Sequence, residues 1–137
     1  MRKLLLCAGL VTVVCCSSFA DQIPKSIFGV YGPAAPGRSR PAQNSIRITR
    51  RTPSHANIVL KLYYANGHTC QLNSDGHWEG DRLVFIAVGL EPNQSCKLEA
   101  FFPPGHIRLS DEGQRCAPVY CGARGKLDGV VLSKTRH

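Results

Sequence analysis

The chain has 137 residues, with 17 Lys and Arg against 9 Asp and Glu, which gives a formal net charge of +8. This length fits one domain, and a composition of 43% hydrophobic and 19% charged residues is that of a globular chain rather than a disordered one. Length and composition therefore exclude a multidomain enzyme, a coiled coil and a polytopic membrane protein.

The N-terminus has the layout of a secretory signal peptide. A basic start at Arg2 and Lys3 is followed by the apolar stretch 4–14 and by a small-x-small ending at Ser18-Phe19-Ala20, which predicts cleavage after Ala20. An uncleaved membrane anchor is the alternative, but a spanning helix needs about 20 apolar residues and this stretch is shorter. We therefore expect residues 1–20 to be removed and the product to be periplasmic or secreted, without a membrane-spanning segment.

Four cysteines remain after this cleavage, and their even number predicts two disulfides, because paired cysteines are typical of small exported domains. Cys70 and Cys96 fall in strand candidates, whereas Cys116 and Cys121 are separated by only four residues. We therefore favour the pairs Cys70–Cys96 and Cys116–Cys121. Zinc coordination by cysteine and histidine is the alternative, and export to an oxidising compartment argues against it. No metal or cofactor is expected.

Residues 21–44 lack the pattern of a helix or a strand. Four prolines and three glycines interrupt the segment, and its basic side chains outnumber Asp21, its one acidic residue. The composition predicts an irregular, Pro/Gly-rich basic arm over residues 21–44 and a β-domain over residues 45–137. Apolar side chains such as Ile27 and Tyr31 could still dock part of the arm on that domain.

From Ser45 onward, apolar and polar residues alternate with the period of two that is typical of strands. The extended segments expected from this pattern are 45–49, 57–64, 68–72, 82–88, 95–102, 106–110 and 127–134. Asn66-Gly67 indicates a tight hairpin turn, and Asn73 to Gly76 indicates another. Short strands at regular spacing predict an all-β fold with two disulfides, either a small antiparallel β-barrel or a sandwich, and the pattern does not separate these two.

Several short motifs between His68 and Gly129 resemble a known group of proteins. They include the runs His68-Thr-Cys-Gln-Leu72 and Cys121-Gly-Ala-Arg-Gly125. The chain resembles small exported proteobacterial proteins with a Cys-Gly-Ala-Arg-Gly signature near the C-terminus. This resemblance implies a periplasmic β-fold with paired cysteines and no established activity. In size and expected architecture the chain is also similar to periplasmic inhibitors of lysozymes and proteases. It lacks a lysozyme-inhibitor signature such as a Ser-Gly-x-x-Tyr loop, so this similarity is architectural and implies no site residues.

The segment from Cys116 to Gly125 is the best candidate for a binding site. If a disulfide closes it, Tyr120 and Arg124 project from a rigid loop, which suits protein recognition because little entropy is lost on binding. In the alternative interpretation, Gly122 and Gly125 permit a tight turn, and Arg124 satisfies backbone carbonyls within the fold.

An enzymatic function has weaker support. No Gly-x-Ser-x-Gly elbow is present, and we assign no catalytic residue. A small ribonuclease would draw its acid–base and phosphate-binding groups from His68, His77, His106, Glu79, Glu99 and Arg124.

Clusters of Lys and Arg in the sequence raise the question of whether the protein binds nucleic acid. Basic patches with aromatic residues beside them could bind it, but export argues against such a role in the producing cell. We therefore expect an exported cell-envelope binding protein, of an inhibitor or immunity type, whose partner is a protein or an anionic envelope component. A small secreted hydrolase such as a ribonuclease is the alternative.

Overall fold

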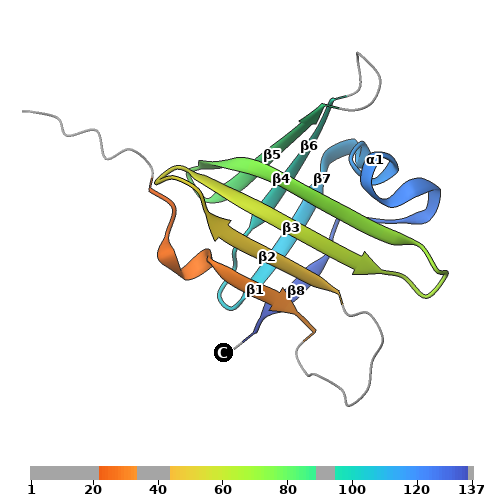
Figure 1. Cartoon of the computed structure of the whole chain (residues 1–137), viewed down its shortest axis with the longest axis horizontal. Coiled ribbons are helices and arrows are strands. Elements are labelled where there is room, and N and C mark those ends of the chain that lie inside the picture. Colours follow the sequence, from red (N-terminus) through yellow and green to blue (C-terminus); the bar gives the residue numbers. More distant parts are fainter. Residues whose placement is uncertain (1–21, 34–43, 89–94, 136–137) are drawn as a thin grey trace, which may run out of the picture.

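The computed structural model describes residues 22–33, 44–88 and 95–135 and folds them into a closed barrel of eight antiparallel strands (Figure 1). Each strand pairs with the next along the chain, and β1 pairs with β8 to complete the ring. Of the two all-β alternatives, the barrel is therefore confirmed. The predicted signal peptide, residues 1–20, lies outside the described residues.

The strands are β1 (Gly29–Gly32), β2 (Ser45–Arg50), β3 (His55–Tyr63), β4 (Thr69–Glu79), β5 (Arg82–Val88), β6 (Ser95–Phe101), β7 (His106–Asp111) and β8 (Val131–Lys134). The helical elements are η1 (Lys25–Ile27), η2 (Glu112–Gln114), α1 (Ala117–Cys121) and η3 (Gly122–Arg124), of which only α1 is an α-helix. η1 and α1 lie toward opposite ends of the barrel (Figure 1).

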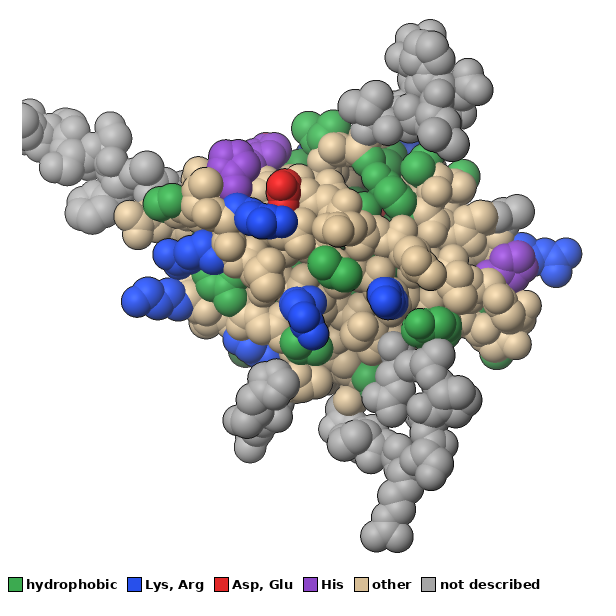
Figure 2. Space-filling model, viewed as in Figure 1, with side chains coloured by type: hydrophobic (Ala, Val, Ile, Leu, Met, Phe, Trp, Pro, Cys, Tyr) green, Lys and Arg blue, Asp and Glu red, His purple; other side chains and the backbone are tan. Residues whose placement is uncertain are grey.

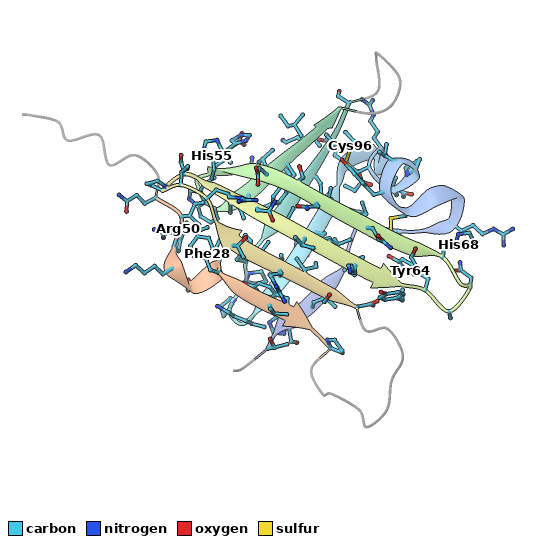
Figure 3. All side chains as sticks on the ribbon, in the orientation of Figure 1. Phe28, Arg50, His55, Tyr64, His68 and Cys96 are labelled. Carbon is cyan, nitrogen blue, oxygen red and sulfur yellow. A yellow bond between two sulfur atoms is a disulfide. The ribbon has the colours of Figure 1, made fainter. Side chains whose placement is uncertain are left out.

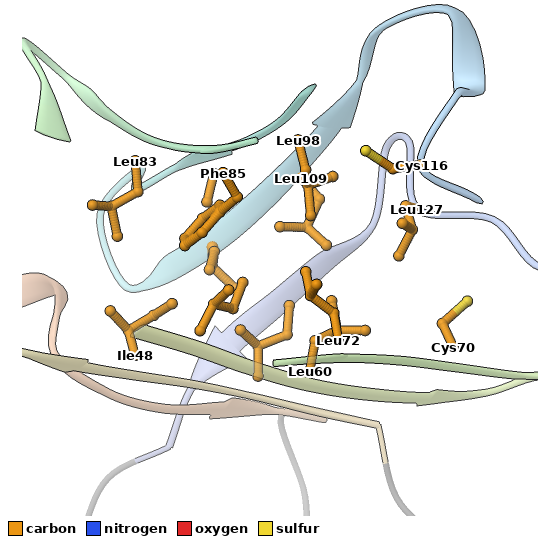
Figure 4. Packing of buried hydrophobic residues seen from close by; sticks show 14 of the residues in the cluster. Ile48, Leu60, Cys70, Leu72, Leu83, Phe85, Leu98, Leu109, Cys116 and Leu127 are labelled. Atoms are coloured by element: carbon orange, nitrogen blue, oxygen red, sulfur yellow. The ribbon is translucent and has the colours of Figure 1, made fainter. Parts of the chain in front are cut away.

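The barrel interior is filled by the apolar members of the predicted alternation. Figure 4 shows side chains from facing walls pointing toward one another, from Ile48 and Leu83 at one end to Cys70 and Cys116 at the other. These residues are almost fully buried, while their sequence neighbours on the strands mostly face outward. Burial of an aliphatic side chain is worth about 1.5–3 kcal/mol, so this alternation supplies much of the force that closes the sheet.

The second predicted turn, Asn73 to Gly76, is wrong. These residues lie inside β4, which continues to Glu79 and pairs with β3 from Thr69 to His77. Gly76 is required by packing rather than by a turn, because a Cβ atom there would lie 2.5 Å from the ring of Phe85. The aromatic ring occupies the space above the glycine and stays in the core.

The irregular arm predicted over residues 21–44 is also wrong in part. Residues 29–32 form β1, which pairs with β2 and β8 and is needed to close the barrel. Tyr31 explains why this short segment is ordered: its ring is buried, and its hydroxyl donates a 2.7 Å hydrogen bond to the carbonyl oxygen of Ile27. Residues 34–43 of the predicted arm lie outside the described residues.

Two disulfides are present as expected, but the favoured pairing is wrong. The bonds join Cys70 to Cys121 and Cys96 to Cys116. Cys70 and Cys96 do face inward, but they belong to β4 and β6, which β5 separates. Each therefore pairs with a cysteine beside α1, on the segment that covers this end of the barrel.

Candidate functional site

The segment that carries α1 begins where β7 ends, and a buried carboxylate fixes its direction. Asp111 is 2% exposed, and its two oxygens accept the backbone N–H groups of Cys116 and Ala117, each at 2.9 Å. These donors lie at the start of α1 and would otherwise have no partner. The Asp111 backbone N–H in turn donates to the carboxylate of Asp128 at 3.1 Å. The chain therefore leaves the barrel and returns to it through one hydrogen-bonded junction.

Two disulfides then hold the ends of α1 on different strands. Cys116 precedes the helix and is bonded to Cys96 on β6, while Cys121 ends the helix and is bonded to Cys70 on β4. A five-residue helix has no stability of its own in water. Its position therefore depends on these covalent links and on the apolar contacts of its buried side.

The Cys-Gly-Ala-Arg-Gly run has a structural explanation at both of its glycines. Gly122 has a positive φ of 68° at the end of α1, a conformation that costs other residues energy. A Cβ atom on Gly125 would lie 2.1 Å from Cβ of Cys121 and 3.0 Å from Sγ of Cys70. Gly125 is thus the position at which the chain packs directly on the disulfide.

The structure places the two predicted binding residues, Tyr120 and Arg124, in different surroundings. Tyr120 is half-buried and packs against the core, and this burial raises the pKa of its hydroxyl. Arg124 is exposed, and no hydrogen bond or ion pair involves its side chain within the described residues. The predicted alternative, in which Arg124 satisfies backbone carbonyls, is therefore absent from this part of the structure.

A hollow of about 490 Å³ lies beside this segment, next to the Cys96–Cys116 disulfide. Ile86 on β5 lines it and is 58% exposed, which is unusual for a large apolar side chain. Arg115 and Glu112 line the side toward η2, and Lys97 lines the side toward β6. The hollow thus combines one open apolar wall with charged groups of both signs.

The charges near α1 differ from those on the neighbouring strands. Arg115, Arg124 and Lys126 are exposed and form no ion pair among the described residues, whereas Glu112 is the one exposed acid between residues 112 and 126. We call the exposed side chains of Arg115, Val119, Arg124 and Lys126 the α1 surface. Its cations are available to a partner.

On β4 to β6, by contrast, the charges neutralise one another. Arg82 contacts Glu99 at 2.9 Å and Asp81 at 3.1 Å, and Lys97 contacts Glu99 at 2.8 Å. The hydrogen bond from Lys97 lowers the pKa of the Glu99 carboxyl group. These groups already have partners, so they offer little to a second protein. This network includes Lys97 at the hollow. Among the described lining residues, Arg115 is therefore the cation there that has no ion pair.

Of the residues considered for a ribonuclease, the structure brings His77 and Glu79 together, whereas the three histidines His68, His77 and His106 lie on different elements. His68 lies in the turn between β3 and β4, and His106 begins β7, where its Nδ1 contacts the carbonyl oxygen of Pro104 at 2.8 Å. His77 lies on the outer side of β4, with its Nε2 2.6 Å from Oε1 of Glu79. Its cross-strand neighbour is His55, which does not belong to the residues expected for a ribonuclease.

Comparison with known proteins adds no family. No protein-family model matches the chain, and neither does a curated protein or a solved structure. Within residues 22–33, 44–88 and 95–135, no helix has the length and apolar character needed to cross a membrane. The same part of the chain contains no group of three or more His, Cys, Asp or Glu side chains placed to hold a metal ion.

Proposed function

We propose that this protein is an exported binding protein that acts on another protein, in the manner of an inhibitor, and that the α1 surface makes the contact. The observation that carries the proposal is the bracing of α1 by one disulfide at each end, with exposed cations flanking the helix that form no ion pair among the described residues. Tyr120 supports the segment from beneath, and Arg124 is its exposed recognition residue.

The bracing favours recognition because it lowers the entropic cost of binding. An exposed loop of this length would lose conformational freedom when a partner ordered it, and each immobilised side chain adds to that cost. Here the backbone is already fixed by the Asp111 hydrogen bonds and by the disulfides. Binding has to order only the exposed side chains.

The charge of the α1 surface favours an acidic partner. Arginine is enriched at the residues that dominate binding energy, and a complementary charge raises the association rate. Val119 is 38% exposed and Ile86 is 58% exposed, so apolar contacts are available beside the cations. The partner surface expected from this arrangement is acidic with an apolar projection that reaches the hollow.

The test uses the mature, oxidised protein immobilised and exposed to envelope and secreted proteins. The captured partner is identified, purified and titrated against wild type and against the triple variant Arg115→Glu/Arg124→Glu/Lys126→Glu. We expect the triple variant to bind at least about tenfold more weakly, mainly through a slower association rate. If the partner is an enzyme, wild type should lower its turnover and the triple variant should not.

The matched control changes net charge by the same amount at another surface. Lys25, Arg47 and Lys61 are exposed and form no ion pair among the described residues. Lys25 is in η1, Arg47 is on β2 and Lys61 is on β3, away from α1 in the sequence. Figure 2 shows Lys and Arg side chains spread over the face of the barrel that β1 to β4 form. The variant Lys25→Glu/Arg47→Glu/Lys61→Glu should retain the partner. Loss of binding in this control, with binding kept in the α1 variant, would contradict the proposal.

A further inference from the structure

Two histidines lie directly opposite each other on the outer side of the barrel. His55 on β3 pairs in register with His77 on β4, and their ring centroids are 6.4 Å apart. The backbone N–H of Trp78 donates to the carbonyl oxygen of Ser54 at 2.9 Å. This bond makes His55 and His77 a non-hydrogen-bonded pair, the kind of antiparallel pair in which opposed side chains approach most closely.

Each imidazole has one nitrogen held by a neighbour. His55 Nδ1 lies 3.0 Å from the hydroxyl oxygen of Ser54 and 3.2 Å from that of Thr52. His77 Nε2 lies 2.6 Å from Oε1 of Glu79. The other two nitrogens, Nε2 of His55 and Nδ1 of His77, have no hydrogen-bond partner among the described residues.

This arrangement matches the surroundings of histidines that bind metals. A metal-ligating imidazole generally donates its other N–H to a carboxylate or another oxygen, which fixes the tautomer and makes the ligating nitrogen more basic. Glu79 provides this partner for His77, and the hydroxyls of Ser54 and Thr52 provide it for His55. Both imidazoles therefore have the hydrogen-bond partner that a two-histidine metal site needs. The contact at one nitrogen of each ring leaves the other nitrogen for the metal ion.

We propose that Nε2 of His55 and Nδ1 of His77 bind one divalent transition-metal ion between β3 and β4. Imidazole suits Zn²⁺, Ni²⁺ and Cu²⁺, and the general order of affinities places Cu²⁺ first. The described residues offer no third protein ligand in position. Two imidazoles therefore bind the ion on one side, and solvent or a donor from another molecule completes its coordination.

The site is independent of the proposed protein-binding function. His55 and His77 lie toward the end of β4 that is far from Cys70, and Figure 3 shows His55 at the opposite end of the barrel from Cys96 and His68. Both disulfides keep the described cysteine sulfurs out of metal coordination. Failure of the metal site would leave the α1 proposal untouched, and the reverse also holds.

The experiment is a Cu²⁺ titration of the oxidised, untagged protein by calorimetry, with electron paramagnetic resonance to count the coordinated nitrogens. We expect one ion per chain and two imidazole nitrogens. His55→Ala and His77→Ala should each remove the site, while His106→Ala should leave the Cu²⁺ affinity unchanged. Glu79→Ala should weaken binding by about 10- to 100-fold, the usual effect of removing a hydrogen-bond partner of a ligating histidine.

A second control separates the role of Glu79 from a general loss of negative charge. Glu99 belongs to the same network of charges through Arg82 but forms no hydrogen bond or ion pair with either imidazole among the described residues. Glu99→Ala should therefore retain the affinity that Glu79→Ala loses, with folding of each variant checked by circular dichroism. The proposal is overturned if wild type binds Cu²⁺ no better than the double variant His55→Ala/His77→Ala. A resonance spectrum with fewer than two coordinated nitrogens would also overturn it.

Discussion

The two ends of the barrel are closed by different kinds of interaction. At the η1 end, Ile23 and Ile27 are buried, and the ring of Phe102 lies 6.2 Å from those of both Tyr31 and Trp78. At the α1 end, the covering segment is held by two disulfides and by the buried carboxylate of Asp111. One end is closed by packing of large side chains, whereas at the other end disulfides add covalent links to the packing.

This difference determines which side chains remain available. At the η1 end, the exposed Arg50 takes part in the packing: its guanidinium lies 4.9 Å from the ring centroid of Phe28 and contacts the carbonyl oxygen of Ile23. At the α1 end, covalent bracing fixes the backbone, so Arg115, Arg124 and Lys126 are not needed for its position. Because the backbone of the α1 surface is held without these exposed side chains, the side chains can contact a partner protein.

Removal of a disulfide at the α1 end is expected to cause the largest loss of stability. The Cys70–Cys121 bond joins residues 51 apart and the Cys96–Cys116 bond joins residues 20 apart. Closure of the longer loop constrains the unfolded chain more, so Cys70→Ala/Cys121→Ala should lower the free energy of unfolding by about 4 kcal/mol and Cys96→Ala/Cys116→Ala by about 3 kcal/mol. Guanidinium denaturation measures both. Equal stability of wild type and either variant would show that covalent bracing is not what holds this end.

A smaller loss of stability is expected from Gly125→Ala. The added methyl group meets Cβ of Cys121 and Sγ of Cys70, and overpacking of this kind costs about 1–3 kcal/mol. Gly122→Ala is the matched control, because nothing lies within 4 Å of a Cβ there and only the positive φ is unfavourable. In thermal unfolding, Gly125→Ala should be the more damaging of the two. The opposite order would mean that the chain does not pack on the disulfide.

At the η1 end, Tyr31→Phe should lower the free energy of unfolding by about 1 kcal/mol near neutral pH, because one buried hydrogen bond to the carbonyl of Ile27 is lost. Burial raises the pKa of Tyr31 from its usual 10.0 to about 12. The unfolded chain therefore loses this proton first as the pH rises, and wild-type stability should fall between pH 10 and 12.

Tyr31→Phe removes that contribution, so its stability should fall less steeply than that of wild type over the same alkaline range. Burial also raises the pKa values of Tyr64 and Tyr120, which is why some alkaline loss should remain in the variant. Urea denaturation at several pH values compares the two proteins. If stability fell equally with pH in the two proteins, the Tyr31 hydroxyl would lie in water rather than in the core.

The smallest expected change in stability is that of Arg124→Ala, below about 0.5 kcal/mol, since the side chain is exposed and has no partner within the described residues. Partner binding should nevertheless weaken. A melting curve and a binding titration of the same sample check both statements. A drop of several degrees in melting temperature would assign Arg124 to the fold instead.

Much of the barrel could be predicted from local sequence, because alternation reports which side of a strand is buried. It identified β2, β5 and β6 to within a few residues. It missed β1, whose four residues include two glycines, and it divided β4 at Gly76, where the glycine accommodates the ring of Phe85 rather than a turn. Local composition does not distinguish a glycine needed for a turn from one needed for close packing.

The cysteine pairing required the order of strands, which local patterns do not contain. Cys70 and Cys96 were correctly placed on inward faces, but β5 separates their strands. The helix between Cys116 and Cys121 is also too short for its period to be recognised. The His55–His77 pair was within reach, since a hairpin centred on Asn66 places these residues opposite each other.

Hydrogen exchange of the protein bound to its captured partner tests the central claim most directly, because it reports on both ends of the barrel in one experiment. We predict slower exchange in residues 112–126 and in 95–97 beside the hollow, with unchanged exchange in residues 22–33. Slower exchange confined to the η1 end or to the outer side of β2 and β3, with residues 112–126 unaffected, would contradict the assignment of the α1 surface as the binding site.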